Sequence, residues 1–170
     1  IVDLNRAPDD FRPDGVIKTV TCWDVPVYGS FPTPELISTL LSKYYHPYHQ
    51  LLESPHRQVR LCVDCHTMAA VGPPVGPDTG RGRPPVCLGD GGGVTMPNDW
   101  TRLLGECMQR AFGQPVAINN PFRGGYITRS HGQQRPWVQI ELSRAPFMAN
   151  ERKRQCVLQA LAEFCETVFF

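Results

Sequence analysis

Apolar and polar residues alternate in two segments of the chain. In Val59–Cys65 and again in Trp137–Leu142, every second residue is apolar, and such alternation predicts half-buried β-strands. The opening residues Ile1–Leu4 are expected to be the end of another buried strand, so we expect the chain to be a fragment or a processed product. Shorter apolar runs predict the remaining strands, at 86–88, 116–118 and 126–128.

Apolar residues at helical spacing predict three helices. The first begins at the capping residue Thr33 and is expected to kink at Pro47. The second starts at Asn98 and ends before Gly113, and the third begins near Asn150. Long loops near the functional site are expected in the segments rich in Pro, Gly and Asp, residues 7–32 and 72–97.

Strands that alternate with amphipathic helices indicate an α/β fold. We expect a three-layer α/β/α architecture around a mostly parallel or mixed sheet, with an antiparallel pair near Tyr126 and Trp137. A length of 170 residues suits one domain with a real core. We therefore expect residues 1–170 to form a single domain, incomplete at its N-terminus.

Charge and hydropathy argue against several classes of protein. The chain has 17 basic and 16 acidic residues, a formal net charge of +1, and no long run of one sign, so a nucleic-acid partner is not expected. No apolar stretch approaches the roughly 20 residues that span a bilayer, and the first residues lack a signal-peptide pattern. We expect no membrane partner and a cytoplasmic location, and we predict no oligomeric state.

The seven cysteines do not predict a disulfide framework. Their number is odd and several fall on apolar faces, which favours reduced thiols packed in the core. The segment 62–66 matches the haem-attachment pattern Cys-x-x-Cys-His, but covalent haem needs export and a second axial ligand, so we do not expect it. A redox pair is also disfavoured, because Cys-x-x-Cys usually opens a helix and here it closes a predicted strand.

Charged residues interrupt two of the predicted strands. Asp64 and His66 are two positions apart, so their side chains point to the same side of an extended segment, and Asp64 can orient the imidazole. In the later strand, Gln139 and Glu141 share the polar face. The residues alone leave two other interpretations open: a histidine that is merely satisfied at a strand end, and an exposed face on which Glu141 pairs with Arg144.

Six short blocks follow one another along nearly the whole chain. They are Asp3-Leu4-Asn5-Arg6, Tyr45-His46-Pro47-Tyr48-His49, Asp64-Cys65-His66-Thr67-Met68, Cys87-Leu88-Gly89-Asp90, residues 120–128 and residues 139–144. In this order they resemble the N-formylglutamate amidohydrolase (formylglutamate deformylase) family and, more distantly, zinc-dependent aspartoacylases and carboxypeptidases. The resemblance implies a zinc-carboxypeptidase-like or aspartoacylase-like fold and a zinc-dependent hydrolase. Its implied substrate is N-formyl-L-glutamate or a similar N-acyl acidic amino acid, cleaved in histidine catabolism.

The resemblance also implies roles for single residues. His66 is expected to be a zinc ligand, and Glu141 is expected to be the general acid or base that acts on zinc-bound water. Asn5 and Arg6 are expected to bind the carboxylate or carbonyl group of the substrate.

A dicarboxylate substrate calls for planar cationic groups. Arg6, Arg123 and Arg129 could bind its carboxylates through two parallel hydrogen bonds each. Ordinary surface ion pairs account for Arg123 and Arg129 equally well.

The sequence departs from the related zinc enzymes in its metal ligands. Those enzymes take a histidine and a carboxylate from a His-x-x-Glu-like motif before their Asp-Leu-Asn-Arg segment, and this sequence has no such motif before Asp3. His46 and His49, three positions apart on the first helix, could substitute, although helix packing explains their block better. The alternative to an enzyme is therefore a non-catalytic or truncated relative that retains the fold and a ligand pocket.

Overall fold

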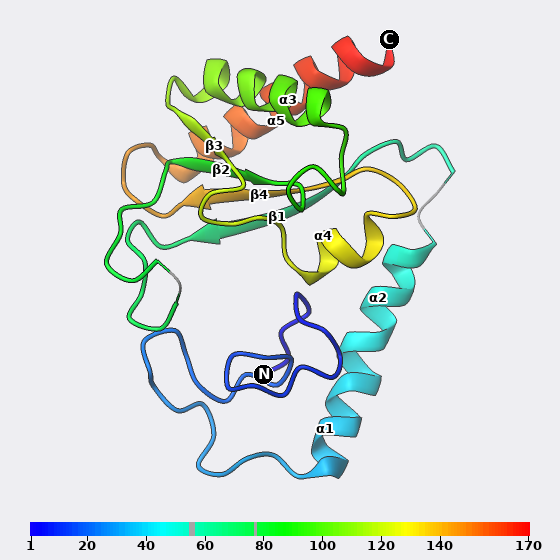
Figure 1. Ribbon diagram of the computed structural model, residues 1–170, viewed down its shortest axis with the longest axis vertical. Helices are drawn as coiled ribbons and strands as arrows, with labels where there is room; N and C mark the ends of the chain where they lie inside the picture. The colour runs from blue at the N-terminus through cyan, green and yellow to red at the C-terminus, as the bar shows by residue number, and fades with distance from the viewer. Residues whose placement is uncertain (55–56, 77) are drawn as a thin grey trace. The chain divides into compact units, whose positions relative to one another are not determined.

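The structure, a computed structural model, describes residues 1–54, 57–76 and 78–170 (Figure 1). These residues group into two compact units. The first unit comprises residues 1–60 and 73–80, and the second comprises residues 61–72 and 81–170.

The second unit is built on a four-stranded mixed sheet with the order β1-β4-β2-β3. The outer pairs β1/β4 and β2/β3 are parallel, whereas β4 and β2 are antiparallel. The mixed α/β prediction is confirmed, but the antiparallel pair lies at β2 and β4 rather than near Tyr126. The strands are β1 Cys62–Met68, β2 Val86–Gly89, β3 Val116–Ile118 and β4 Trp137–Ser143.

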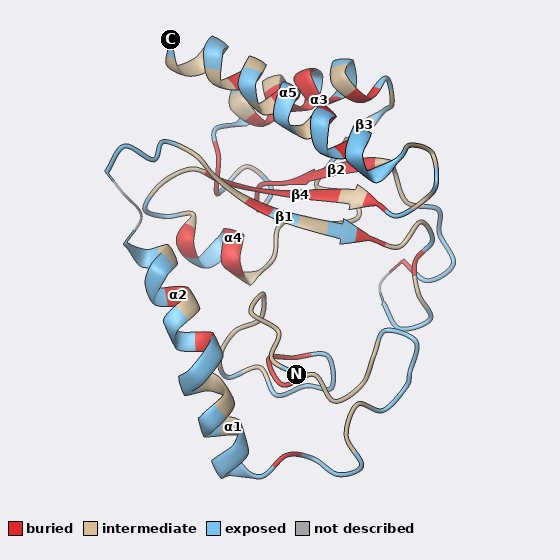
Figure 2. Ribbon diagram, turned by 180° about the vertical axis from the view of Figure 1, so that it is seen from behind, coloured by how far each residue is buried: buried red, intermediate tan, exposed pale blue. Residues whose placement is uncertain are grey.

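Helices lie on both faces of this sheet. Figure 1 shows α3 (Asn98–Phe112) and α5 (Asn150–Phe169) on one face and α4 (Tyr126–His131) on the other. The core lies between β2, β4 and the two long helices, and it includes Leu88 and Ile140. Figure 2 shows how thoroughly β2 and the larger part of β4 are buried. Burial of this apolar surface is the main stabilising contribution to the unit.

The strand predicted at 126–128 is wrong, because these residues begin α4. Ile127, Thr128 and His131 are buried, a spacing that places one face of a helix toward the sheet. Ser130 Oγ donates a hydrogen bond to the carbonyl of Tyr126 and adds to the helical turn. A run of only three residues carries too little periodicity to separate a strand from a short helix.

The first unit contains a continuous helical segment over 34–53. Thr33 caps it as predicted, since Thr33 Oγ1 accepts a hydrogen bond from the Leu36 amide. The helix expected to kink at Pro47 instead widens into a π-helical turn just before that proline. A wider turn relieves the clash between a proline ring and the preceding carbonyls. The segment consists of α1 Pro34–Leu40, the π-helical turn η1 Leu41–Tyr45 and α2 His46–Glu53.

The opening residues do not form a buried strand. Ile1 is 65% exposed, and Val2 makes only an isolated antiparallel bridge with Ile17. The predicted loop at 7–32 is otherwise confirmed, and its residues Val16 and Ile17 are fully buried. The fully buried residue of this bridge is Ile17 and not Val2. The apolar character of residues 1–4 therefore did not indicate a buried strand.

The described part of the chain contains no helix that is both long and apolar enough to cross a membrane. All seven cysteines are free thiols. Cys87, Cys107 and Cys156 are buried as predicted, whereas Cys22 and Cys65 are exposed.

Candidate active site

Parallel pairing of β1 with β4 brings the two polar sequence segments together. The register places Asp64 opposite Gln139 and His66 opposite Glu141. Since side chains alternate between the faces of a strand, these four side chains lie on one face of the sheet. His66 lies within β1, which continues to Met68, and not at the end of the strand as predicted. The predicted sharing of one face is confirmed for both pairs.

Asp64 orients the imidazole of His66. The distance from His66 Nε2 to Asp64 Oδ1 is 2.7 Å, and Asp64 is 7% exposed. The His66 side chain is 33% exposed. A buried carboxylate therefore fixes the ring while part of the ring faces solvent, where a ligand can reach it.

Glu141 is buried, so its predicted alternative as part of an exposed strand face is wrong. Burial raises the pKa of Glu141, and the charge of Asp64 raises it further, whereas the charges of His66 and Arg83 and the hydrogen bond from Gln139 oppose the rise. A carboxyl group with a raised pKa can hold a proton near neutral pH more readily than an ordinary glutamate.

The alternative pairing of Glu141 with Arg144 is also wrong. Arg144 Nη1 donates instead to Thr67 Oγ1 over 3.4 Å. Glu141 Oε1 accepts a hydrogen bond from Gln139 Nε2 over 2.9 Å. The amide therefore fixes the orientation of the carboxyl group.

Gln139, predicted to share the polar face with Glu141, also carries a polar atom to which the sequence assigned no role. Its side-chain oxygen Oε1 is among the described buried atoms that have no hydrogen-bond partner. A buried acceptor without a partner costs free energy, roughly 1–3 kcal/mol. Such an atom is a candidate acceptor for a hydrogen bond from a ligand or a water molecule.

Arg83 and Cys87 are further neighbours of Glu141 that sequence reasoning missed. Cys87 of β2 is the register partner of Glu141 on the side away from His66, and it is fully buried. The charge of Arg83 acts on Glu141, and its guanidinium lies 4.8 Å from the ring centroid of Phe122. Arg83 stands in the loop rich in glycine and proline, where no periodic pattern signals its position.

Close packing at Gly89 positions the segment that carries Arg123. A Cβ atom at Gly89 would lie 2.4 Å from the backbone nitrogen of Gly124, so only glycine fits. Arg123 and Arg129 are both exposed, and neither forms an ion pair within the described residues. Their role in binding carboxylates stays a prediction.

Asp90, in the same sequence block as Gly89, has a structural role. It is 1% exposed and accepts hydrogen bonds from Thr101 Oγ1, Asn119 Nδ2 and the Gly93 amide. Burial alone would raise the pKa of Asp90, but these hydrogen bonds outweigh it and the pKa is lowered. Asp90 therefore fixes the turn after β2 as a buried carboxylate.

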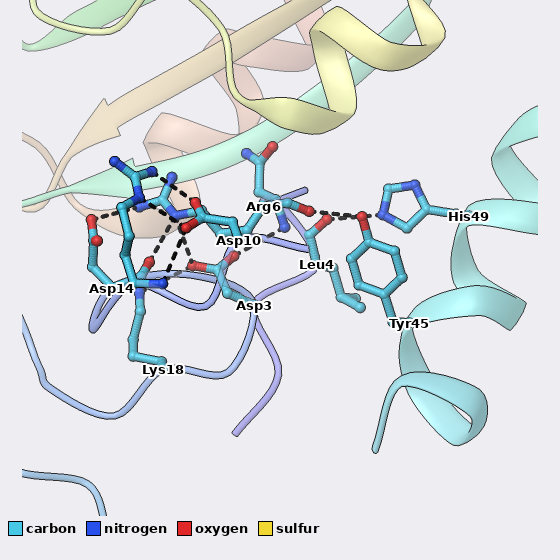
Figure 3. Close-up of polar contacts among 10 residues, drawn as sticks. Asp3, Leu4, Arg6, Asp10, Asp14, Lys18, Tyr45 and His49 are labelled. Carbon is cyan, nitrogen blue, oxygen red and sulfur yellow. Dashed lines mark hydrogen bonds and ion pairs between the residues drawn. The ribbon is translucent and has the colours of Figure 1, made fainter. Parts of the chain in front are cut away.

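Asn5 and Arg6 belong to the first unit, in a turn over Asp3–Arg6 (Figure 3). Arg6 Nε donates to the carbonyl of Asp14 over 2.8 Å, and Arg6 Nη2 lies 3.5 Å from Asp14 Oδ2. The amide of Asn5 donates to Asp3 Oδ1 over 3.0 Å. The turn is thus held by its own loop as well as by the helical segment beside it.

His46 and His49 do not form a pair of metal ligands. His49 Nε2 contacts the carbonyl of Leu4 over 3.0 Å, whereas His46 is exposed. Burial lowers the pKa of His49, which favours the neutral ring. The bond to Leu4 therefore accounts for His49 without a metal.

The described residues do not contain a complete site for zinc. Within 1–54, 57–76 and 78–170, no group of three or more His, Cys, Asp or Glu side chains is arranged to hold a metal ion. A catalytic zinc site takes three protein ligands, and these residues do not supply such a set. The residues present therefore do not fit zinc by themselves.

Known proteins resemble the chain in both structure and sequence. The structure of N-formylglutamate amidohydrolase from Ralstonia eutropha JMP134 superposes with a TM-score of 0.75 at 22% identity, over 98% of this chain and 73% of that one. A gene product of Agrobacterium tumefaciens superposes with a TM-score of 0.66 at 18% identity, over 98% of this chain and 67% of that one. Both show the α/β fold.

Two curated N-formylglutamate deformylases match in sequence. The Pseudomonas aeruginosa protein is 27% identical and the Pseudomonas putida protein is 29% identical, each over 87% of this chain. The chain spans 60% of the length of each. The family model of N-formylglutamate amidohydrolase matches residues 1–148. The chain therefore belongs to the N-formylglutamate amidohydrolase family.

Proposed function

We propose that this protein hydrolyses the amide of N-formyl-L-glutamate, or of a similar N-acyl acidic amino acid, to formate or another acid and the free amino acid. The observation that carries the proposal is the pairing of His66 with Glu141 across β1 and β4. Family membership supports the reaction class, and the relatives are named for this substrate.

Glu141 is the proposed general acid and base. Its raised pKa favours a group that takes a proton from the attacking water and returns it to the leaving amine. Gln139 holds the carboxyl group in one orientation. Amide hydrolysis needs this transfer because an amine leaves poorly unless it is protonated.

Zinc is the proposed cofactor, with His66 as one ligand. The resemblance carried by the sequence blocks and the partly exposed ring of His66, fixed by Asp64, support this assignment. When bound, zinc polarises a carbonyl group and lowers the pKa of a water molecule.

Asn5, Arg6, Arg123 and Arg129 are the proposed groups that bind the substrate. Guanidinium groups bind carboxylates through two parallel hydrogen bonds, which suits an acidic amino acid. The proposal leaves the acyl group open, because one methyl group changes the discrimination between a formyl and an acetyl substrate by only about 1–3 kcal/mol.

The test is formate release from N-formyl-L-glutamate by the wild-type protein, by Glu141→Gln and by a matched control, Glu166→Gln. Glu166 is exposed on α5. We expect the wild type and the control to release formate at equal rates, and Glu141→Gln to lose about 10²–10⁴-fold in rate. Binding of N-formyl-L-glutamate without hydrolysis by the wild type would favour the non-catalytic alternative.

Elemental analysis tests the metal separately. If His66 is a zinc ligand, the zinc bound by the wild type stays in His46→Ala, since His46 is exposed, and is lost in His66→Ala. Equal zinc content in all three proteins would remove His66 as a ligand.

A further inference from the structure

Two side chains of the helical segment bond the backbone of the Asp3–Arg6 turn (Figure 3). Tyr45 Oη donates to the carbonyl of Arg6 over 2.7 Å, and His49 Nε2 lies 3.0 Å from the carbonyl of Leu4. A carbonyl oxygen can only accept, so His49 Nε2 carries the hydrogen. The two bonded carbonyls stand on either side of Asn5.

Both donors are buried and packed against each other. Tyr45 is 2% exposed and His49 is 7% exposed. Their ring centroids are 4.3 Å apart with an interplanar angle of 31°. A buried polar group keeps its hydrogen bond, because losing it leaves an unsatisfied atom away from water. This pair therefore holds the turn in one position.

The shape of the helical segment aims these two side chains in the same direction. Tyr45 is the last residue of η1, and His49 follows four positions later in α2, so the two lie on one helix face. The neighbouring Tyr44 is 50% exposed and His46 is exposed. Tyr44 and His46 are thus exposed residues of the same two types beside the bonded Tyr45 and His49.

A second set of bonds fixes the start of the same turn. The amide of Asp3 donates to the carbonyl of Val16 over 2.8 Å, and Lys18 Nζ lies 3.0 Å from Asp3 Oδ2. All of these bonds use the backbone of the turn or the side chain of Asp3. None of these bonds uses the side chain of Asn5 or Arg6, the proposed substrate-binding groups, and the Arg6 guanidinium bonds Asp14 instead.

We propose that Tyr45 and His49 are positioning residues, which hold Asn5 and Arg6 in the geometry that binds the carboxylate or carbonyl of the substrate. This inference rests on the proposed function. A small displacement of a binding group lowers catalytic efficiency even when the displaced group is intact. If the turn binds the substrate and the transition state equally, a loose turn raises KM and leaves kcat nearly unchanged.

The test uses variants that remove one hydrogen bond each. Tyr45→Phe removes only the hydroxyl, His49→Leu removes the donor, and His49→Gln restores an N–H donor. Tyr44→Phe and His46→Gln are matched controls at the exposed positions. The readouts are kcat and KM for N-formyl-L-glutamate, the NMR shifts of the Asn5 and Arg6 amides, and the melting temperature of each folded variant.

We expect Tyr45→Phe and His49→Leu to raise KM about tenfold, the effect of one hydrogen bond, and to shift the Asn5 and Arg6 amides. His49→Gln is expected to recover most of the loss, and both controls are expected to match the wild type. If the wild type is active and both variants leave KM and the two amide shifts unchanged, the positioning role is overturned and the proposed function stands. Absence of formate release by the wild type would contradict the proposed function instead, and with it this inference.

Discussion

The carboxylates of the two units are stabilised in different ways. In the second unit, Asp64, Asp90 and Glu141 are 7%, 1% and 6% exposed, and hydrogen-bonded neighbours surround them. In the first unit, the acidic residues near the Asp3–Arg6 turn form ion pairs with arginine and lysine, and the side chains of Asp3, Asp10 and Asp14 are 23%, 14% and 56% exposed. Burial makes a group sensitive to the loss of any one partner, whereas exposed charges are replaced by water at little cost.

The pKa values show the same contrast. Burial is the largest influence on Glu141 and raises its pKa. In the first unit, the side-chain hydrogen bond from Arg12 lowers the pKa of Asp10 to about 2. The Arg12 side chain of this pair is 74% exposed, so salt screens the interaction. A shifted pKa therefore indicates a candidate catalytic group only where burial accompanies it.

Asp90→Asn is expected to have the largest effect on stability. The amide would turn an N–H group toward the donors of Thr101, Asn119 and Gly93, and we expect a loss of about 3 kcal/mol in the free energy of unfolding. Chemical denaturation measures this loss. Asp99→Asn is the control, because the Asp99 side chain is 83% exposed. Equal effects of the two variants would break the contrast between buried and exposed carboxylates.

The pH dependence of stability sharpens the same comparison. Because folding lowers the pKa of Asp90, its contribution is fully present above roughly pH 4, the value in an unfolded chain, and is lost as the pH falls through the folded value. We therefore expect Asp90→Asn to flatten the acid side of the stability curve relative to the wild type. A parallel curve would show that Asp90 is not the titrating group.

Gly89→Ala is expected to destabilise the second unit by about 2 kcal/mol, because the new Cβ atom would collide with backbone atoms of Arg123 and Gly124. Thermal unfolding measures the change. Gly82→Ala is the control, since no atom lies within 4 Å of its Cβ position. A neutral Gly89→Ala would show that the 123–124 segment can move away from β2.

Asp10→Asn is expected to have the smallest effect. Its partner Arg12 is two residues away in an exposed loop, so we expect unfolding at physiological salt to be unchanged within error. Denaturation at low and high salt checks this. A marked loss of stability at high salt would mean that the first unit also depends on its ion pairs.

The sheet residues were predictable from the sequence, because a period of two assigns each side chain to a face. The alternation in Val138–Leu142 predicted that Gln139 and Glu141 share a face, and the structure agrees. Register was not predictable, since the pairing of His66 with Glu141 joins segments more than 70 residues apart. Arg83 also escaped prediction because its loop has no periodicity.

The first unit was less predictable for a related reason. The aromatic block 45–49 indicated a helix face, but nothing in its spacing shows that Tyr45 and His49 bond the backbone at Arg6 and Leu4. Ile1–Leu4 resembled a strand because three of its four residues are apolar, yet no neighbouring strand pairs with it beyond one bridge at Val2 among the described residues. Hydrogen bonds to backbone carbonyls leave no pattern in a sequence.

The most direct test of the His66–Glu141 centre is a comparison of formate release from N-formyl-L-glutamate by four proteins: wild type, His66→Ala, Glu141→Gln and the double variant. If the two side chains act as one unit, each single variant loses most of the activity. The double variant then loses little more than the less active single variant, because the effects of groups that act together do not add. Wild-type activity in either single variant, or losses that simply add, would contradict a shared centre on β1 and β4.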